Sequence, residues 1–161
     1  MRAYRRPDGG INIFRPDQNV ASFNASAERM VMPKVDEQQH IEAIKQLILA
    51  DQTWVPDQVG ASLYLRPAMF ATTPQPGLGA AATYTHFIIA CSVGPFFKGG
   101  FNPVSVYVSD EIRRAVKGGV GEAKTGGNYA ASLFMGEQAA KDGYTQLLWL
   151  DAIEGRFVEE V

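Results

Sequence analysis

The sequence predicts an α/β fold in two parts, and three observations support this. Up to about Val93, helical and strand patterns alternate in a way that indicates helices packed on a mostly antiparallel sheet. The composition then changes at residues 94–100, where glycine, proline and phenylalanine crowd together as in a linker. A strand, a helix and further strands follow. We therefore expect a small α+β domain over residues 1–97, a linker over 98–103 and the start of a larger α/β domain over 104–161.

The bulk composition excludes several classes of function. A hydrophobic share of 46% and a charged share of 20% are ordinary for a soluble globular protein. A net charge of −2 without a basic run argues against nucleic-acid binding. The single Cys91 allows no internal disulfide, and two distant histidines, His40 and His86, make a metal site improbable. The longest apolar run, Phe87 to Val93, cannot span a bilayer, and no secretory signal is present. We expect a cytoplasmic protein with no membrane partner.

The first elements are a strand and two helices. Residues 11–14 form a short strand pattern, after which Asp17 can cap a helix that Pro33 ends. One apolar stripe along this helix comprises Val20, Phe23, Ala27 and Met30. Asp36 can cap a second helix, and residues 54–57 form the exit from this helix. Its inward face comprises Ile41, Ile44, Leu47 and Ile48.

Strand patterns follow these helices. Residues 62–66 alternate, Pro67 limits their place in a sheet, and residues 69–72 extend the pattern. A proline- and glycine-rich loop over 74–79 leads to a buried strand over 84–93.

The second part starts with a strand over residues 104–108. Ser109 can cap a short helix through Ala115, and a glycine-rich loop covers 118–127. A helix over 129–141 ends at Gly143. A buried strand over 147–150, a turn at Gly155 and a last strand over 157–161 complete the chain.

The glycine-rich loop is the most informative segment for chemistry. Five glycines in ten residues cost backbone entropy, and such a loop persists where the backbone must approach another group closely. Lys124 lies in its middle and Tyr129 at the mouth of the next helix. A lysine that forms an imine acts as the neutral amine, so this pattern favours a covalent carbonyl site. The glycine spacing is not that of a phosphate-binding P-loop.

Residues 123–132, Ala-Lys-Thr-Gly-Gly-Asn-Tyr-Ala-Ala-Ser, resemble the Schiff-base segment of the branched-chain aminotransferases, which are fold-type IV pyridoxal-phosphate (PLP) enzymes. Further segments match the family in order and approximate spacing. They are residues 14–16, 54–56, 62–67, 99–100 with 103–105, and 158–161. The resemblance implies a small domain followed by the beginning of a larger PLP-binding domain, and a homodimer.

The resemblance also implies roles for single residues. Lys124 would hold PLP and move a proton between the substrate Cα and the cofactor C4′. Glu160 would keep the pyridine nitrogen protonated. Tyr129 would order the cofactor site, and Tyr64 and Arg66, on one strand face, would shape the substrate pocket. A loop near Leu78 and Ala80 would reach the neighbouring subunit, although it is two residues longer here than in the family.

The chain departs from the family pattern at three points. Ser22 stands where the family carries the arginine that binds the PLP phosphate, and Arg15 or Arg29 are the candidate substitutes. Phe96 stands where many relatives have a tyrosine near the substrate. The chain also matches only the middle of the expected enzyme, so that Met1 is expected to be an internal methionine and more chain to follow Val161.

The expected function is transfer of the amino group between branched-chain amino acids and 2-oxoglutarate. Two alternatives stay open. The first is another fold-type IV enzyme, a D-amino-acid transaminase or an aminodeoxychorismate lyase. The second is a non-catalytic relative, which the serine at position 22 motivates.

Overall fold

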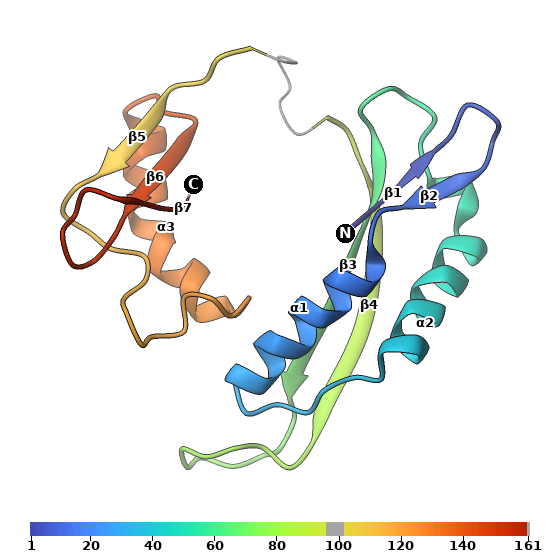
Figure 1. Ribbon diagram of the computed structural model, residues 1–161, viewed down its shortest axis with the longest axis horizontal. Coiled ribbons are helices and arrows are strands. Elements are labelled where there is room, and N and C mark those ends of the chain that lie inside the picture. Colours follow the sequence, from blue (N-terminus) through green and yellow to red (C-terminus); the bar gives the residue numbers. More distant parts are fainter. Residues whose placement is uncertain (96–101, 161) are drawn as a thin grey trace. The chain divides into compact units, whose positions relative to one another are not determined.

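The computed structural model describes residues 1–95 and 102–160. The chain divides into two compact units, Met1–Gly100 and Phe101–Val161 (Figure 1). The first combines two α-helices with a sheet and the second combines one described α-helix with a sheet, which confirms the predicted mixture of helix and sheet. No helix in the described part of the chain is long and apolar enough to cross a membrane.

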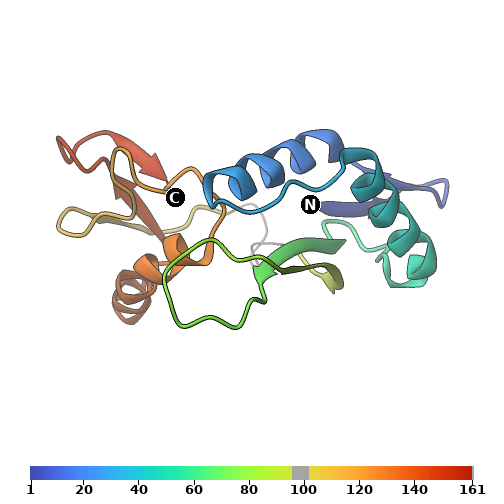
Figure 2. The same cartoon turned by 90° about the horizontal axis from the view of Figure 1, so that it is seen from below.

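A four-stranded antiparallel sheet with the strand order β2-β1-β3-β4 forms the base of the first unit. The strands are β1 (Arg2–Arg5), β2 (Ile11–Ile13), β3 (Ser62–Ala71) and β4 (Tyr84–Val93). The sequence predicted β2, β3 and β4, but not β1, whose four residues include only one buried side chain, Ala3. Helices α1 and α2 lie over one face of this sheet (Figure 2).

Helix α1 (Pro16–Arg29) begins at Arg15, whose positive φ of 44° turns the chain into the helix. Pro16 occupies the first turn, where a missing N–H costs nothing. Asp17 is therefore inside the helix, and the prediction that it caps the helix is wrong. Its carboxylate instead pairs with the Arg15 guanidinium at 2.7 Å.

Helix α2 (Glu37–Ala50) begins as predicted, because the Asp36 carboxylate accepts the Gln39 N–H at 2.9 Å. A short 3-10 turn, η1 (Gln52–Trp54), follows it. The predicted inward face is largely confirmed, since Ile44 and Ile48 are buried. The core of this unit joins α2 to β1 and β3 through Ala3, Ile44, Ile48, Val55, Leu63 and Leu65.

Pro67 lies inside β3, so the two predicted pieces form one strand. The Leu65 N–H points to the Met1 carbonyl at the start of β1, and residue 67 has its nitrogen on the same side. The described pairing of β1 with β3 reaches only Tyr64 and Leu65, so Pro67 interrupts none of the hydrogen bonds described between these two strands.

Strand β4 is mostly exposed, and the prediction that it is a buried strand is wrong. It is the outermost strand of the sheet, and the helices cover one face only. Side chains such as Ile89 and Phe87 lie on the other face and stay accessible. An apolar run can therefore mark an edge strand as well as a central one.

His40 and His86 meet beneath α1, with ring centroids 4.9 Å apart and Phe23 beside both. His40 is 3% exposed, and within the described residues neither of its ring nitrogens has a hydrogen-bond partner. Burial, and then the nearby His86, lowers the pKa of His40. Among residues 1–95 and 102–160, no group of three histidine, cysteine or carboxylate side chains is arranged to hold a metal.

The second unit is built on a three-stranded sheet with the order β5-β6-β7. Strands β5 (Val106–Ser109) and β6 (Gln146–Leu150) run parallel and are connected by α3 (Gly126–Lys141). Strand β7 (Val158–Glu160) runs antiparallel to β6. Gly143, with a φ of +80°, and Gly155, with a φ of +66°, make the turns that the sequence predicted.

The predicted short helix from Ser109 to Ala115 does not form. The Ser109 hydroxyl donates to the Ile112 carbonyl at 2.8 Å instead of accepting a backbone N–H as a cap would. The Arg113 guanidinium also donates to the Ser109 carbonyl at 3.3 Å. Side chains therefore satisfy carbonyls that helical N–H groups would otherwise bind.

Candidate active site

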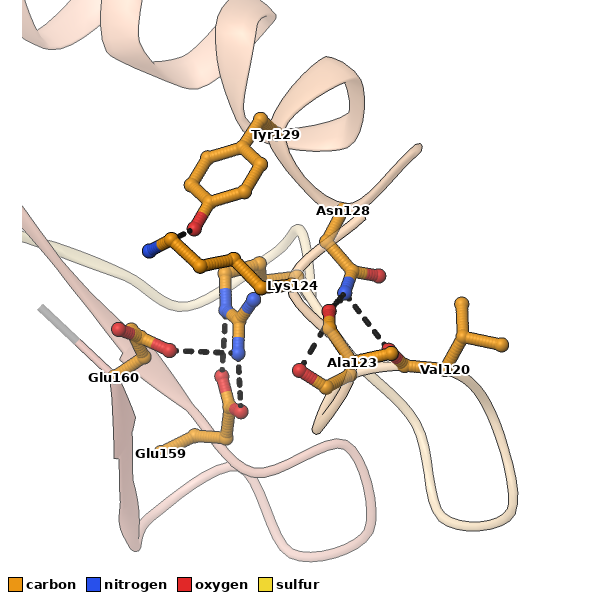
Figure 3. Close-up of polar contacts among 9 residues, drawn as sticks. Val120, Ala123, Lys124, Asn128, Tyr129, Glu159 and Glu160 are labelled. Carbon is orange, nitrogen blue, oxygen red and sulfur yellow. Dashed lines mark hydrogen bonds and ion pairs between the residues drawn. The ribbon is translucent and has the colours of Figure 1, made fainter. Parts of the chain in front are cut away.

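A buried side chain, that of Asn128, contacts the glycine-rich loop from the helix that follows it. The Asn128 amide, 6% exposed, donates to the carbonyls of Val120 at 2.8 Å and Ala123 at 2.7 Å (Figure 3). Because Asn128 is in the first turn of α3, it ties the loop to the start of the helix. Helix α3 consequently begins at Gly126, before the predicted start at Tyr129. Lys124 follows buried Ala123 and is separated from the start of the helix by Thr125 alone.

Lys124 and Tyr129 face one another at this junction. The lysine amine donates to the Tyr129 hydroxyl at 3.1 Å and lies 5.6 Å from the centre of the ring (Figure 3). The lysine is exposed and Tyr129 is half exposed, so the amine is accessible to a carbonyl compound. A phenol in hydrogen-bond contact with an amine can orient it.

A cavity of about 470 Å³ lies between α3 and β6, a volume suited to a small molecule. Tyr129 and Glu160 line it together with Arg114, Leu147 and Trp149. Lys124 is not among the residues that line the cavity, but its amine is hydrogen-bonded to the hydroxyl of Tyr129, which does line it. Three predicted site residues, Lys124, Tyr129 and Glu160, are therefore brought to one region of the second unit.

Arg114 is a member of this region that the sequence analysis missed. Its guanidinium holds Glu159 at two points, through Nε at 3.1 Å and Nη2 at 2.8 Å. The same Nη2 pairs with Glu160 Oε2 at 2.8 Å. The hydrogen bond with Glu159 is the main reason that the pKa of Arg114 is raised. These partners are 45 residues apart in sequence, so no local pattern signals the contact.

The turn that brings β7 to the site is organised by Asp151. Its carboxylate accepts backbone N–H groups from Ile153, Glu154, Arg156 and Phe157 at 2.7–3.1 Å. These bonds, the one from Glu154 first, hold the pKa of Asp151 well below its usual range. An Asp followed by a glycine four residues later, at Gly155, is the sequence signal for this turn.

The remaining predicted site residues belong to the first unit. Tyr64 and Arg66 share the β3 face away from the helices, as their spacing predicted, and Arg66 donates to the Tyr64 hydroxyl at 3.0 Å. Ser22 is exposed on α1. Leu78 is fully exposed in the loop between β3 and β4. Phe96 lies outside the described residues.

The second unit thus offers the groups that a carbonyl cofactor with a basic ring nitrogen needs. Lys124 supplies an accessible amine, Tyr129 a hydroxyl that accepts from it, and Glu160 a carboxylate on the cavity wall. The residues present fit PLP at its aldehyde and ring-nitrogen ends.

Comparison with known proteins finds branched-chain-amino-acid aminotransferases among the relatives of this chain. A branched-chain-amino-acid transaminase 1 of Bacillus subtilis (strain 168) is 50% identical over 162 residues, which is 100% of this chain and 46% of the relative. The branched-chain-amino-acid aminotransferase of Mycolicibacterium smegmatis is 49% identical and is covered to 44% of its length. The chain therefore spans a little less than half the length of these relatives. No protein-family model matches the chain.

Solved structures agree on the fold. A branched-chain amino acid aminotransferase from the organism abbreviated T.th., crystallised with pyridoxamine 5′-phosphate, matches 99% of this chain and 50% of its own, with a TM-score of 0.81 and 24% identity. The Escherichia coli branched-chain amino acid aminotransferase matches 94% and 49%, with a TM-score of 0.74 and 25% identity. The fold is that of about half of each of these proteins.

Proposed function

We propose that this chain, a relative of the branched-chain-amino-acid aminotransferases over its whole length, carries the Schiff-base lysine of a PLP-dependent transaminase. The reaction is the reversible transfer of the amino group between leucine, isoleucine or valine and 2-oxoglutarate. The observation that carries the proposal is the contact of the Lys124 amine with the Tyr129 hydroxyl at 3.1 Å, at the junction of a tied glycine-rich loop and α3.

Each residue of the second unit has a defined task in this proposal. Lys124 Nζ would hold the cofactor at rest and, once the substrate amine has displaced it, would accept and return the proton at the substrate Cα. The Tyr129 hydroxyl orients the amine and shields one side of it. Glu160 would hold the ring nitrogen and favour its protonated form. When bound, PLP supplies the electron sink that makes the Cα proton acidic.

The first unit is proposed to supply the substrate side. Tyr64 and Arg66 form a hydroxyl–guanidinium pair at 3.0 Å, which can bind a substrate carboxylate. Nearby Ile89 and Phe87, on the same sheet face, are apolar and exposed. Such a surface suits an aliphatic amino-acid side chain. Ser22 is proposed to give the cofactor phosphate one hydrogen bond.

We further propose that the active form is a cytoplasmic homodimer that acts on amino acids and 2-oxo acids. A single cysteine and a net charge of −2 suit a reducing compartment and small polar substrates.

The lysine assignment is tested by incubating the chain with PLP, reducing with borohydride and measuring the intact mass. We expect one adduct, mapped to the Lys124 peptide, in the wild type and none in Lys124→Ala. Lys117→Ala, which removes an exposed lysine from the same loop region, is the matched control and should keep the adduct. Equal labelling of Lys124→Ala would reject the assignment, and absence of any specific adduct would favour the non-catalytic alternative.

The substrate class is tested with a panel of amino donors. We expect leucine, isoleucine and valine to be better donors than D-alanine. If D-alanine is the better donor, or if aminodeoxychorismate is the compound consumed, the chain belongs functionally with the other fold-type IV enzymes.

A further inference from the structure

Two neighbouring carboxylates, those of Glu159 and Glu160, both reach the guanidinium of Arg114. Consecutive side chains of a regular strand point to opposite faces, so this is not expected of an undistorted β7. The explanation lies in the pairing with β6. Trp149 pairs with Glu160 and Leu150 pairs with Val158, so one step on β6 faces two steps on β7. Glu159 is the extra residue of a β-bulge.

The bulge gives the two carboxylates different environments. Glu159 is held at two points by Arg114, and its side chain is 26% exposed. Glu160 contacts the same guanidinium through one oxygen, Oε2, at 2.8 Å, and its side chain is 52% exposed. Glu160, moreover, lines the cavity beside Tyr129. The arginine is nine-tenths buried, with a side-chain exposure of 10%, so its position is well determined by packing.

A two-point contact matters because a carboxylate that is bound by both nitrogens of a guanidinium has few lone pairs left for another donor. A one-point contact leaves the second oxygen able to accept from a ligand in the cavity. One buried cation facing two carboxylates also leaves one negative charge uncompensated within this trio. That charge can be balanced by a protonated ring nitrogen.

We infer that Arg114 is a positioning residue that takes Glu159 as its own partner and, through the bulge at Glu159, presents Glu160 to the ring nitrogen of the cofactor. The inference rests on the proposed function and extends it by stating which of two adjacent carboxylates serves the ring and what selects it. Arg114 itself does not touch the reacting atoms.

The first arm of the test needs no cofactor, so its result stands whether or not PLP binds. The Arg114 Nε–H bonds to Glu159, whereas Glu160 meets only Nη2. In NMR spectra of the chain, Glu159→Gln should therefore shift the Arg114 Nε–H signal and speed its exchange with water. Glu160→Gln should leave that signal close to the wild-type position. An equal response to both substitutions would overturn the division of the carboxylates.

The second arm uses PLP labelled with ¹⁵N in the ring, whose chemical shift reports protonation. We expect Glu160→Gln and Arg114→Gln to lose the protonated-ring signal and to raise the Kd for PLP about tenfold. Glu159→Gln should keep the wild-type ring signal. A wild-type ring signal in Arg114→Gln would mean that the arginine only fastens β7, and loss of the signal in Glu159→Gln alone would reverse the roles.

Arg114→Lys provides a second, more conservative variant in case Arg114→Gln does not fold. It keeps a cation but not the planar fork, so we expect a ring signal between those of the wild type and Glu160→Gln. A wild-type signal in this variant would show that charge alone suffices and would refute the two-point argument. Fluorescence of buried Trp149 reports whether β6 is formed in each variant.

Discussion

Replacing Asn128 with alanine should loosen the loop that carries Lys124. The side chain makes two short hydrogen bonds, at 2.7 and 2.8 Å, to the carbonyls of Ala123 and Val120. A net value of about 0.5–1.5 kcal/mol for each bond predicts a loss of about 1–3 kcal/mol in the free energy of unfolding. Asn128→Asp should cost more, because a carboxylate cannot donate and would place its oxygens against two carbonyl oxygens.

The assay is urea unfolding followed by the fluorescence of Trp149, which is 3% exposed in the second unit. A Trp54→Phe background removes the other tryptophan, which belongs to the first unit and is 63% exposed. A loss of about 2 kcal/mol corresponds to a midpoint lower by about 1 M urea. Asn12→Ala, at an exposed strand position, is the control and should stay within about 0.5 kcal/mol of the wild type.

Asn128→Ala and Asn128→Asp should also reduce the yield of the Lys124 adduct with PLP, because the amine is no longer held at the Tyr129 hydroxyl. If Asn128→Ala unfolds with the wild-type midpoint and traps PLP normally, the loop is held by other contacts and the reasoning fails.

Three further predictions concern stability. Asp36→Ala removes the cap of α2 and should cost about 1 kcal/mol in chemical unfolding, whereas Asp36→Asn should cost less. Because the pKa of buried His40 is lowered in the folded chain, its neutral form contributes stability above pH about 6.5, and this stability is lost as the pH falls below that value. The unfolding midpoints measured at pH 8 and at pH 5.5 should therefore differ less in His40→Phe than in the wild type. Asp151, whose pKa is lowered, stabilises the turn above pH about 3.9 and loses this effect as the pH falls; acid titration of Trp149 fluorescence should show a transition that Asp151→Asn weakens, and an unchanged titration would contradict the role of the carboxylate.

Local signals predicted much of the fold. The Asp36 cap, the stripe with Ile44 and Ile48, and the turns at Gly143 and Gly155 each depend on residues within one or two turns of one another. The spacing of Tyr64 and Arg66 also predicted correctly that they share a strand face. Their roles in binding remain predictions.

The errors arose where distant contacts decide the structure. Apolar residues of β4 predicted burial, but its place at the sheet edge depends on strand order, which no local pattern contains. Ser109 looked like a cap, yet it is fully buried and its hydroxyl donates to a carbonyl. The partnership of Arg114 with Glu159 depends on the bulge in β7 and on chain that lies 45 residues away.

The order in which the site can assemble follows from the turn at Asp151. Its farthest bond spans six residues, so the turn closes on the timescale of short loops. The Arg114–Glu159 contact spans 45 residues and can form only after the chain through α3 has brought β5 beside β6. We expect pulse-labelled exchange to protect the Phe157 amide before the Arg114 Nε–H; the reverse order would contradict this. In a partly folded chain, the Asp151 turn would be formed but the contact of Arg114 with Glu159 and Glu160 would not. Lys124 would then be exposed without these carboxylates near it and would react with aldehydes unselectively.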